Sequence, residues 1–160
     1  MAPVSEALMH FKKFEEIESL VRAFEHVEIT PGCWDHRAHL TVACWYLLCR
    51  PFPDAARTMR EGLHRHLTAW GIKTTLERGY HETITLCWMR LLKHHLSTMR
   101  VEKTLVELMN EVIEKFADKD YLFAYFSRER LMSWEARQKW TEPDLKELPS
   151  HEKESIALNE

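Results

Sequence analysis

The chain has 160 residues, 45% of them hydrophobic and 29% charged, and a formal net charge of −3 at pH 7. This length fits one domain that can bury a single core. Lys and Arg are scattered among Asp and Glu, so no basic track is present and we expect no nucleic-acid partner. Four glycines in the whole chain disfavour a turn-rich β protein and a glycine-rich phosphate loop.

The apolar residues recur at helical spacing along almost the whole chain. A stripe from Phe11 to Phe24 predicts a first helix, which Pro31-Gly32 interrupts. A second helix is expected at about 35–50 with Asp35 as its N-cap. It is apolar on nearly every side, which is typical of a central helix.

A third helix is expected from a cap at Asp54 to Gly71, with a buried stripe that reaches Leu63, Leu67 and Trp70. A fourth is expected at about 81–99. Its predicted core face is made of His81, Ile84, Trp88, Leu91, Leu92 and His95.

A fifth helix is predicted from the apolar residues between Leu105 and Phe116. The run 121–126 favours a short aromatic helix, with a strand as the alternative. Ser133 is expected to cap a last helix through Trp140. We therefore predict an all-α, compact single-domain bundle of about six to seven helices over residues 1–148, with a disordered tail at 149–160.

The N-terminal region has charges where a secretory signal needs its apolar core, and no apolar run approaches the ~20 residues of a membrane span. We therefore expect no membrane partner. The four cysteines form no CxxC pair and no secreted disulfide pattern. A reduced, cytoplasmic protein is the prediction that follows.

Two polar clusters stand at the starts of the second and fourth helices. Trp34 precedes His36 and His39, which are three residues apart and share a helix face. His81 begins the fourth helix within its apolar stripe, so we expect it to point to the same interior. Neutral imidazoles are good ligands of Zn, Fe, Mn, Ni or Cu, and three protein ligands with an open position are typical of catalytic zinc.

Glu82 follows His81 about 100° around the helix. It is a candidate fourth ligand or general base. Two histidines with one carboxylate are typical of iron(II) oxygenases, so a non-haem iron oxygenase stands beside a metal-dependent hydrolase or lyase. Because Thr85 stands where HExxH needs histidine, the zincin protease pattern is absent.

A structural interpretation of the same residues stays open. Glu82 is favoured in a first turn by the helix dipole, and Thr83 and Thr85 are able to bond to backbone. His81 is able to donate to a carbonyl in the core. Cys33, three residues before His36, is a weaker candidate for a thiolate–imidazolium pair, since nothing marks an oxyanion hole.

Three motifs resemble a group of small bacterial proteins of unassigned function, over about residues 24–149. They are aromatic-x-H-x-x-H (Trp34, His36, His39), Y-H-E-T-x-T (Tyr80, His81, Glu82, Thr83, Thr85) and S-x-x-A-R-x-x-aromatic-x-x-P-D (Ser133, Ala136, Arg137, Trp140, Pro143, Asp144). The family often has HHDH at the first motif, where this chain has His-Arg-Ala-His. The resemblance supports the choice of residues and implies no reaction.

The resemblance also makes Arg137 and Asp144 candidate residues of the site. They are interpreted either as a salt bridge at a helix end or as an anion clamp and support for the site.

Three hypotheses follow from the residues. The first is a metal-dependent enzyme acting on a small molecule, with the metal held by His36, His39 and His81. The second is a non-catalytic module that binds a small ligand or a metal. The third is a helical protein-interaction domain whose histidines are structural.

Overall fold

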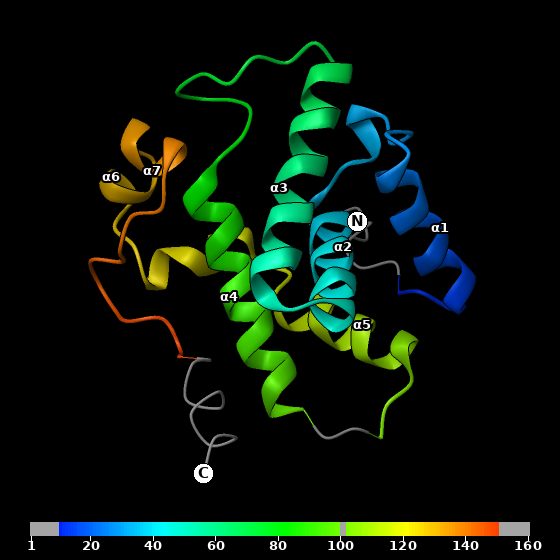
Figure 1. Cartoon of the computed structure of the whole chain (residues 1–160). Helices are drawn as coiled ribbons and strands as arrows, with labels where there is room; N and C mark the ends of the chain where they lie inside the picture. The colour runs from blue at the N-terminus through cyan, green and yellow to red at the C-terminus, as the bar shows by residue number, and fades with distance from the viewer. Residues whose placement is uncertain (1–9, 100–101, 151–160) are drawn as a thin grey trace, which may run out of the picture.

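The computed structural model describes residues 10–99 and 102–150, so the predicted tail from 151 onward lies outside the described residues. All regular structure in the described ranges is helical, as predicted. In chain order the elements are α1 (Phe14–Glu25), η1 (Pro31–Cys33), α2 (His36–Cys49), α3 (Phe52–Ala69), α4 (Glu82–Thr98), α5 (Leu105–Lys115), η2 (Lys119–Ala124), α6 (Arg128–Leu131) and α7 (Trp134–Gln138) (Figure 1). Within the described residues, no helix has the length and apolarity that crossing a bilayer requires.

The central position expected for α2 is confirmed. The helix packs against α1, α3, α4 and α5, and buried residues occur on all its sides. Its N-cap is Asp35, whose carboxylate accepts the N–H of Ala38 at 2.7 Å. Because a cap fixes where the helix begins, it also fixes the direction of His36 and His39 in the first turn.

The start of α3 differs from the prediction. The helix begins at Phe52, and Asp54 lies in the first turn, where it pairs with Arg57 at 3.0 Å. The reason is that Pro53 tolerates the first turn well, since its φ is preset and its missing N–H has no helical partner there. The predicted end is confirmed, because Gly71 follows the helix with φ +68°.

The C-terminal part holds η2, α6 and α7. The run at 121–126 lies mostly in the 3-10 helix η2, and α6 is a short helix that the periodicity does not predict. Ser133 caps α7 as expected, but the helix ends at Gln138. The chain leaves it in an extended conformation at Lys139, whose carbonyl accepts the hydroxyl of Thr83 at 2.8 Å.

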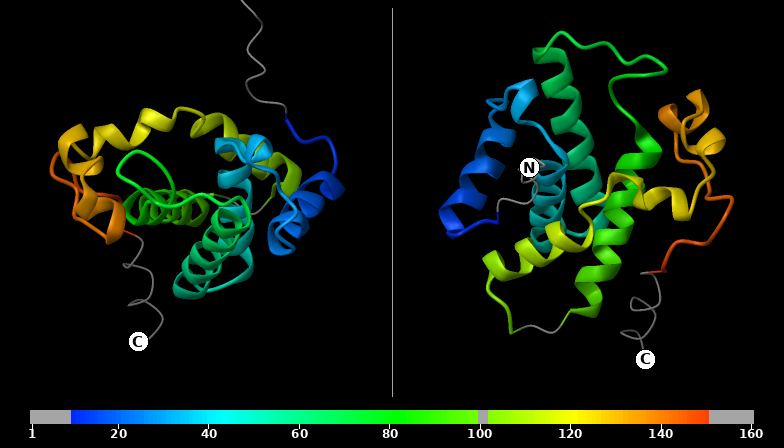
Figure 2. Two further views of the ribbon diagram at one scale, coloured as in Figure 1. Left: turned by 90° about the horizontal axis from the view of Figure 1, so that it is seen from above. Right: turned by 180° about the vertical axis from the view of Figure 1, so that it is seen from behind.

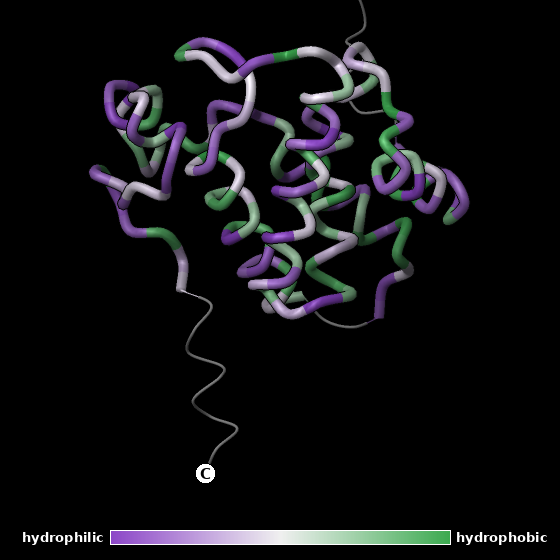
Figure 3. Tube along the Cα trace, turned by 45° about the horizontal axis from the view of Figure 1, so that its top comes forward, coloured by the Kyte–Doolittle hydropathy of each residue, from purple (hydrophilic) through white to green (hydrophobic). Residues whose placement is uncertain are grey.

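The segment 71–81 is a long loop that arches from the end of α3 to the start of α4 (Figure 1). Most of its residues are hydrophilic, with isolated hydrophobic positions (Figure 3). From behind, η2 crosses α4, and α6 and α7 lie to one side of it (Figure 2). The starts of α2 and α4 therefore lie between this loop and the C-terminal segments.

Candidate functional site

Two cavities of about 450 Å³ each adjoin at the starts of α2 and α4. Trp34, His39 and Ile84 line both of them. The volume is in the range of small-molecule sites, which are typically mostly apolar with a few polar groups. Trp34 and Ile84 are each half-buried, which agrees with their place in a cavity wall.

The first cavity lies between α2, α4 and the η2–α6 segment. Its other lining residues are Asp35, His36, Trp88, Lys119, Asp120, Leu122, Phe123, Arg128, Leu131 and Met132. The second lies under the loop at 71–81. Its other lining residues are Leu63, Leu67, Trp70, Glu77, Arg78, Gly79, Tyr80, His81, Thr85 and Arg137.

His39 stands in the shared wall with an unsatisfied ring nitrogen. Its Nε2 is buried and has no hydrogen-bond partner among the described residues. Burial, helped by the nearby His36, lowers the pKa of His39 to about 4. The ring is therefore neutral at pH 7 and able to accept one hydrogen bond and donate another.

His36 lines the first cavity, but one of its nitrogens is already used. Its Nε2–H donates to the carbonyl of Phe116 at 2.7 Å. The ring lies against Trp88, with centroids 4.8 Å apart. Burial lowers the pKa of His36 although the bond to Phe116 opposes this, so this ring also favours the neutral form.

His81 uses both ring nitrogens on the backbone. It is the N-cap of α4, where Nδ1 accepts the N–H of Ile84 at 3.1 Å, and its Nε2–H donates to the carbonyl of Leu131 at 2.7 Å. The side chain is 7% exposed, and burial lowers its pKa to about 4. No lone pair of this ring remains for a metal, as the structural interpretation of His81 expects.

The three histidines line the two adjoining cavities but do not form a set of metal ligands. Among residues 10–99 and 102–150, no group of three or more His, Cys, Asp or Glu side chains is arranged to hold a metal ion. The reason is visible at His36 and His81, which direct Nε2 to different backbone carbonyls. Metal binding here stays a prediction that the described arrangement does not support.

Glu82 has two partners that the sequence pattern does not predict. The Arg60 guanidinium donates to both carboxylate oxygens, at 2.5 to 3.1 Å, and the Tyr80 hydroxyl donates to Oε2 at 2.5 Å. Burial alone raises the pKa of Glu82, but these hydrogen bonds outweigh it and the pKa is lowered. A carboxylate held ionised in this way is poorly suited to act as a general base near pH 7.

The two threonines of the Y-H-E-T-x-T motif bond to backbone. Thr85 donates to the carbonyl of His81 at 2.8 Å, which is the ordinary bond of a helical threonine. Thr83 donates to Lys139 and accepts the N–H of Thr141 at 3.1 Å. Thr83 therefore ties the segment after α7 to α4, while Thr85 also lines the second cavity.

Asp144 is not paired with Arg137. Its carboxylate accepts both the N–H and the hydroxyl of Ser127, at 2.7 and 2.6 Å. These two bonds lower the pKa of Asp144. The salt bridge between Arg137 and Asp144, one of the two interpretations from the sequence, is not formed, and Asp144 instead bonds to Ser127, the residue that caps α6.

Arg137 is 6% exposed and lines the second cavity. Its Nη1 donates to the carbonyls of Gly79 and Tyr80, at 3.4 and 3.1 Å. Its Nε is buried without a partner among the described residues. Burial, with no acidic neighbour to oppose it, lowers the pKa of Arg137.

Several lining residues were predicted for the core instead. Leu63, Leu67, Trp70 and Ile84 belong to the expected apolar stripes but are half-buried, because the loop and α7 leave space above them. Helical periodicity separates inside from outside but does not distinguish a packed neighbour from a cavity. No local sequence pattern predicts the pairing of Arg60 with Glu82, because the two residues are 22 positions apart.

Cys33 is exposed in η1, and the ring of His36 bonds to the carbonyl of Phe116 and not to the Cys33 thiol.

Comparison of the chain with models of protein families, with curated proteins and with solved structures found no match in any of the three.

Proposed function

We propose that this protein is a small-ligand-binding helical module, whose ligand occupies the two adjoining cavities and forms a hydrogen bond with His39. The observation that carries the proposal is the Nε2 of His39. This atom is buried and has no partner among the described residues, and the His39 side chain lines both cavities. A buried polar atom without a partner costs about 1–3 kcal/mol, and a ligand that bonds to it recovers that cost.

The lining indicates the chemistry of the ligand. Trp34 and Trp88 contribute aromatic surface to the first cavity, and Trp34 and Trp70 to the second. Such walls suit an apolar or aromatic body that carries few polar groups. The neutral imidazole of His39 supplies one directional contact for such a group.

The histidine geometry favours binding over metal catalysis. His81 has both nitrogens bonded to backbone, and Glu82 is held by Arg60 and Tyr80. Both side chains are therefore committed to bonds within the protein, and Glu82 lines neither cavity. The non-catalytic alternative from the sequence agrees best with these contacts.

A neutral fluorescent probe, N-phenyl-1-naphthylamine, tests the proposal. It has two aromatic groups and one N–H donor, so we expect saturable binding with a rise in its emission. Ile84→Trp adds bulk to the shared wall, and Leu96→Trp is the matched control. Leu96 is a half-buried residue of the same helix that packs on the core and lines neither cavity.

We expect Ile84→Trp to weaken the probe by at least about tenfold, about 1.4 kcal/mol, because the added ring occupies the space of the ligand. The Leu96→Trp protein should bind within about twofold of the wild type. Thermal melts of both variants identify loss of fold. A wild-type protein without saturable binding, or equal binding by the two folded variants, would overturn the proposal.

A further inference from the structure

The cavity under the loop at 71–81 contains a buried cation without a counter-ion. Arg137 is 6% exposed, and none of the ion pairs within the described part of the chain includes it. Buried arginines are usually paired, because an uncompensated charge in a low-dielectric interior is costly. We therefore expect a further interaction, beyond those within the described residues, to compensate the charge of Arg137.

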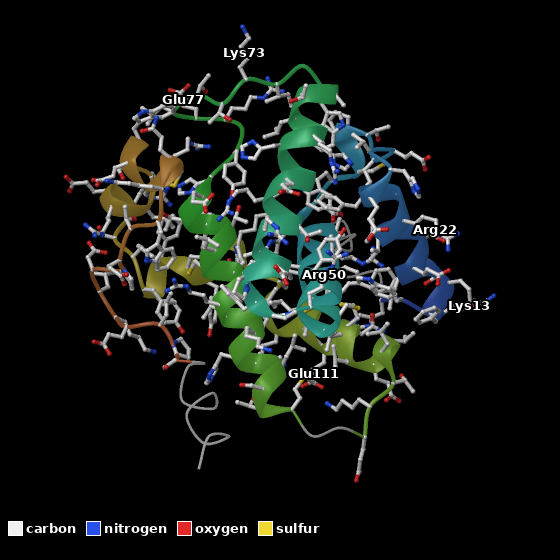
Figure 4. All side chains as sticks on the ribbon, in the orientation of Figure 1. Lys13, Arg22, Arg50, Lys73, Glu77 and Glu111 are labelled. Carbon is white, nitrogen blue, oxygen red and sulfur yellow. The ribbon has the colours of Figure 1, made fainter. Side chains whose placement is uncertain are left out.

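The nearby carboxylates are committed elsewhere or exposed. Glu82 pairs with Arg60, Glu135 with Lys139, and Asp144 bonds to Ser127. Glu77 lines the same cavity but is an exposed residue of the loop (Figure 4). None of these groups neutralises Arg137 in the structure.

The guanidinium is held in place while keeping donors unused. Its Nη1 bonds to the carbonyls of Gly79 and Tyr80, which fix the plane of the group, and its buried Nε–H has no partner. A planar guanidinium fixed in this way is suited to carboxylate, sulfonate or phosphate oxygens, which it binds through a fork of N–H donors.

We infer that Arg137 is the counter-ion of the ligand, so that the natural ligand is an apolar or aromatic molecule with one anionic group. This inference rests on the proposed function. The apolar body lies against Leu63, Leu67 and Trp70 in the second cavity, with the anionic oxygens on Arg137. His39 bonds to a polar group on the far side of the same molecule.

A pair of probes that differ in one charge tests this. 1-Anilinonaphthalene-8-sulfonate has the ring system of N-phenyl-1-naphthylamine with an added sulfonate. We expect the wild type to bind the sulfonate probe about tenfold more tightly. Arg137→Gln should remove this preference, because the variant has no charge to pair with the sulfonate, and the neutral probe should lose less affinity than the sulfonate probe.

Two further variants keep the test decisive. Arg137→Lys retains the charge without the fork and should keep a smaller preference for the sulfonate probe. Arg65→Gln removes an exposed arginine of α3 that lines neither cavity and should change neither affinity by more than twofold. Near-ultraviolet circular dichroism and a melt establish that each variant is folded.

The outcomes separate the two proposals. If the neutral probe binds without any sulfonate preference, or if Arg137→Gln weakens both probes equally, the counter-ion role is overturned and Arg137 is a support for the loop. The same holds if Arg65→Gln loses the preference as strongly as Arg137→Gln. If neither probe binds the wild type, the proposed function itself is overturned.

Discussion

At the scale of single residues, the three histidines have different roles although all favour the neutral form. His81 has both nitrogens paired with backbone, whereas His39 keeps Nε2 without a partner. A fully bonded ring stabilises the fold, and an unbonded one is available to a ligand. Burial lowers the pKa of His39 and of His81 to about 4, and it also lowers the pKa of His36.

These pKa values predict how stability depends on pH. An unfolded histidine titrates near 6.5, so between about pH 4 and 6.5 the unfolded chain binds protons that the folded rings do not. The contribution of each ring is therefore complete above about pH 6.5 and is lost as the pH falls toward 4. It amounts to about 3 kcal/mol for a ring whose pKa is lowered to about 4, such as His81.

His81→Asn isolates one ring, because asparagine retains the ability to cap α4 but does not titrate. Urea unfolding at several pH values is the measurement. Near pH 5, the free energy of unfolding of the wild type should rise with pH more steeply than that of the variant, by about 1.4 kcal/mol per pH unit. Parallel curves would mean that His81 is protonated in the folded protein.

At the scale of elements, the loop at 71–81 is fixed at its C-terminal end. Gly79 has φ +99°, and a Cβ there would lie 2.6 Å from the Cα of Thr74. The carbonyls of Gly79 and Tyr80 both accept from Arg137 of α7. Close packing within the loop and hydrogen bonds from α7 therefore shape the roof of the second cavity.

Gly79→Ala should disturb this roof, because alanine is strained at positive φ and its methyl group meets Thr74 backbone. We expect a loss of about 1–3 kcal/mol in the free energy of unfolding and faster amide exchange over the loop. Gly32→Ala is the control, since nothing lies within 4 Å of a Cβ there. Equal stability of the two variants would show that the loop is not held as described.

At the scale of the whole molecule, the sequence predicts the helices better than it predicts the spaces between them. Caps at Asp35 and Ser133 follow from local hydrogen bonding, which a few neighbouring residues determine. The half-buried state of Ile84 depends on where η2 and α7 lie. The pair formed by Arg60 and Glu82 joins two helices, and periodicity along one helix contains no information about it.

The sequence predicts which residues line the site better than it predicts how their side chains are bonded. Trp34, His36, His39, Tyr80, His81 and Arg137 line the cavities, as expected for a site at the starts of the two helices. The directions of the imidazole nitrogens could not be predicted from the sequence. Whether an imidazole points at a metal or at the carbonyl of Leu131 depends on a residue 50 positions away.

His39 has a buried ring nitrogen without a partner among the described residues, and the proposed ligand bonds to it. The most direct measurement compares His39→Phe with His66→Phe, by the affinity for N-phenyl-1-naphthylamine and by melting temperature. Both histidines have a buried Nε2 without a partner in the described structure, but His66 bonds to the carbonyl of Gly62 and lines neither cavity.

His39→Phe keeps the ring and removes the nitrogen. We expect it to melt at or above the wild-type temperature and to bind the probe about fivefold more weakly, the value of one hydrogen bond of about 1 kcal/mol. His66→Phe should melt at a lower temperature and bind the probe as the wild type does. Unchanged probe affinity in a folded His39→Phe protein would show that the ring nitrogen of His39 does not bond to the ligand.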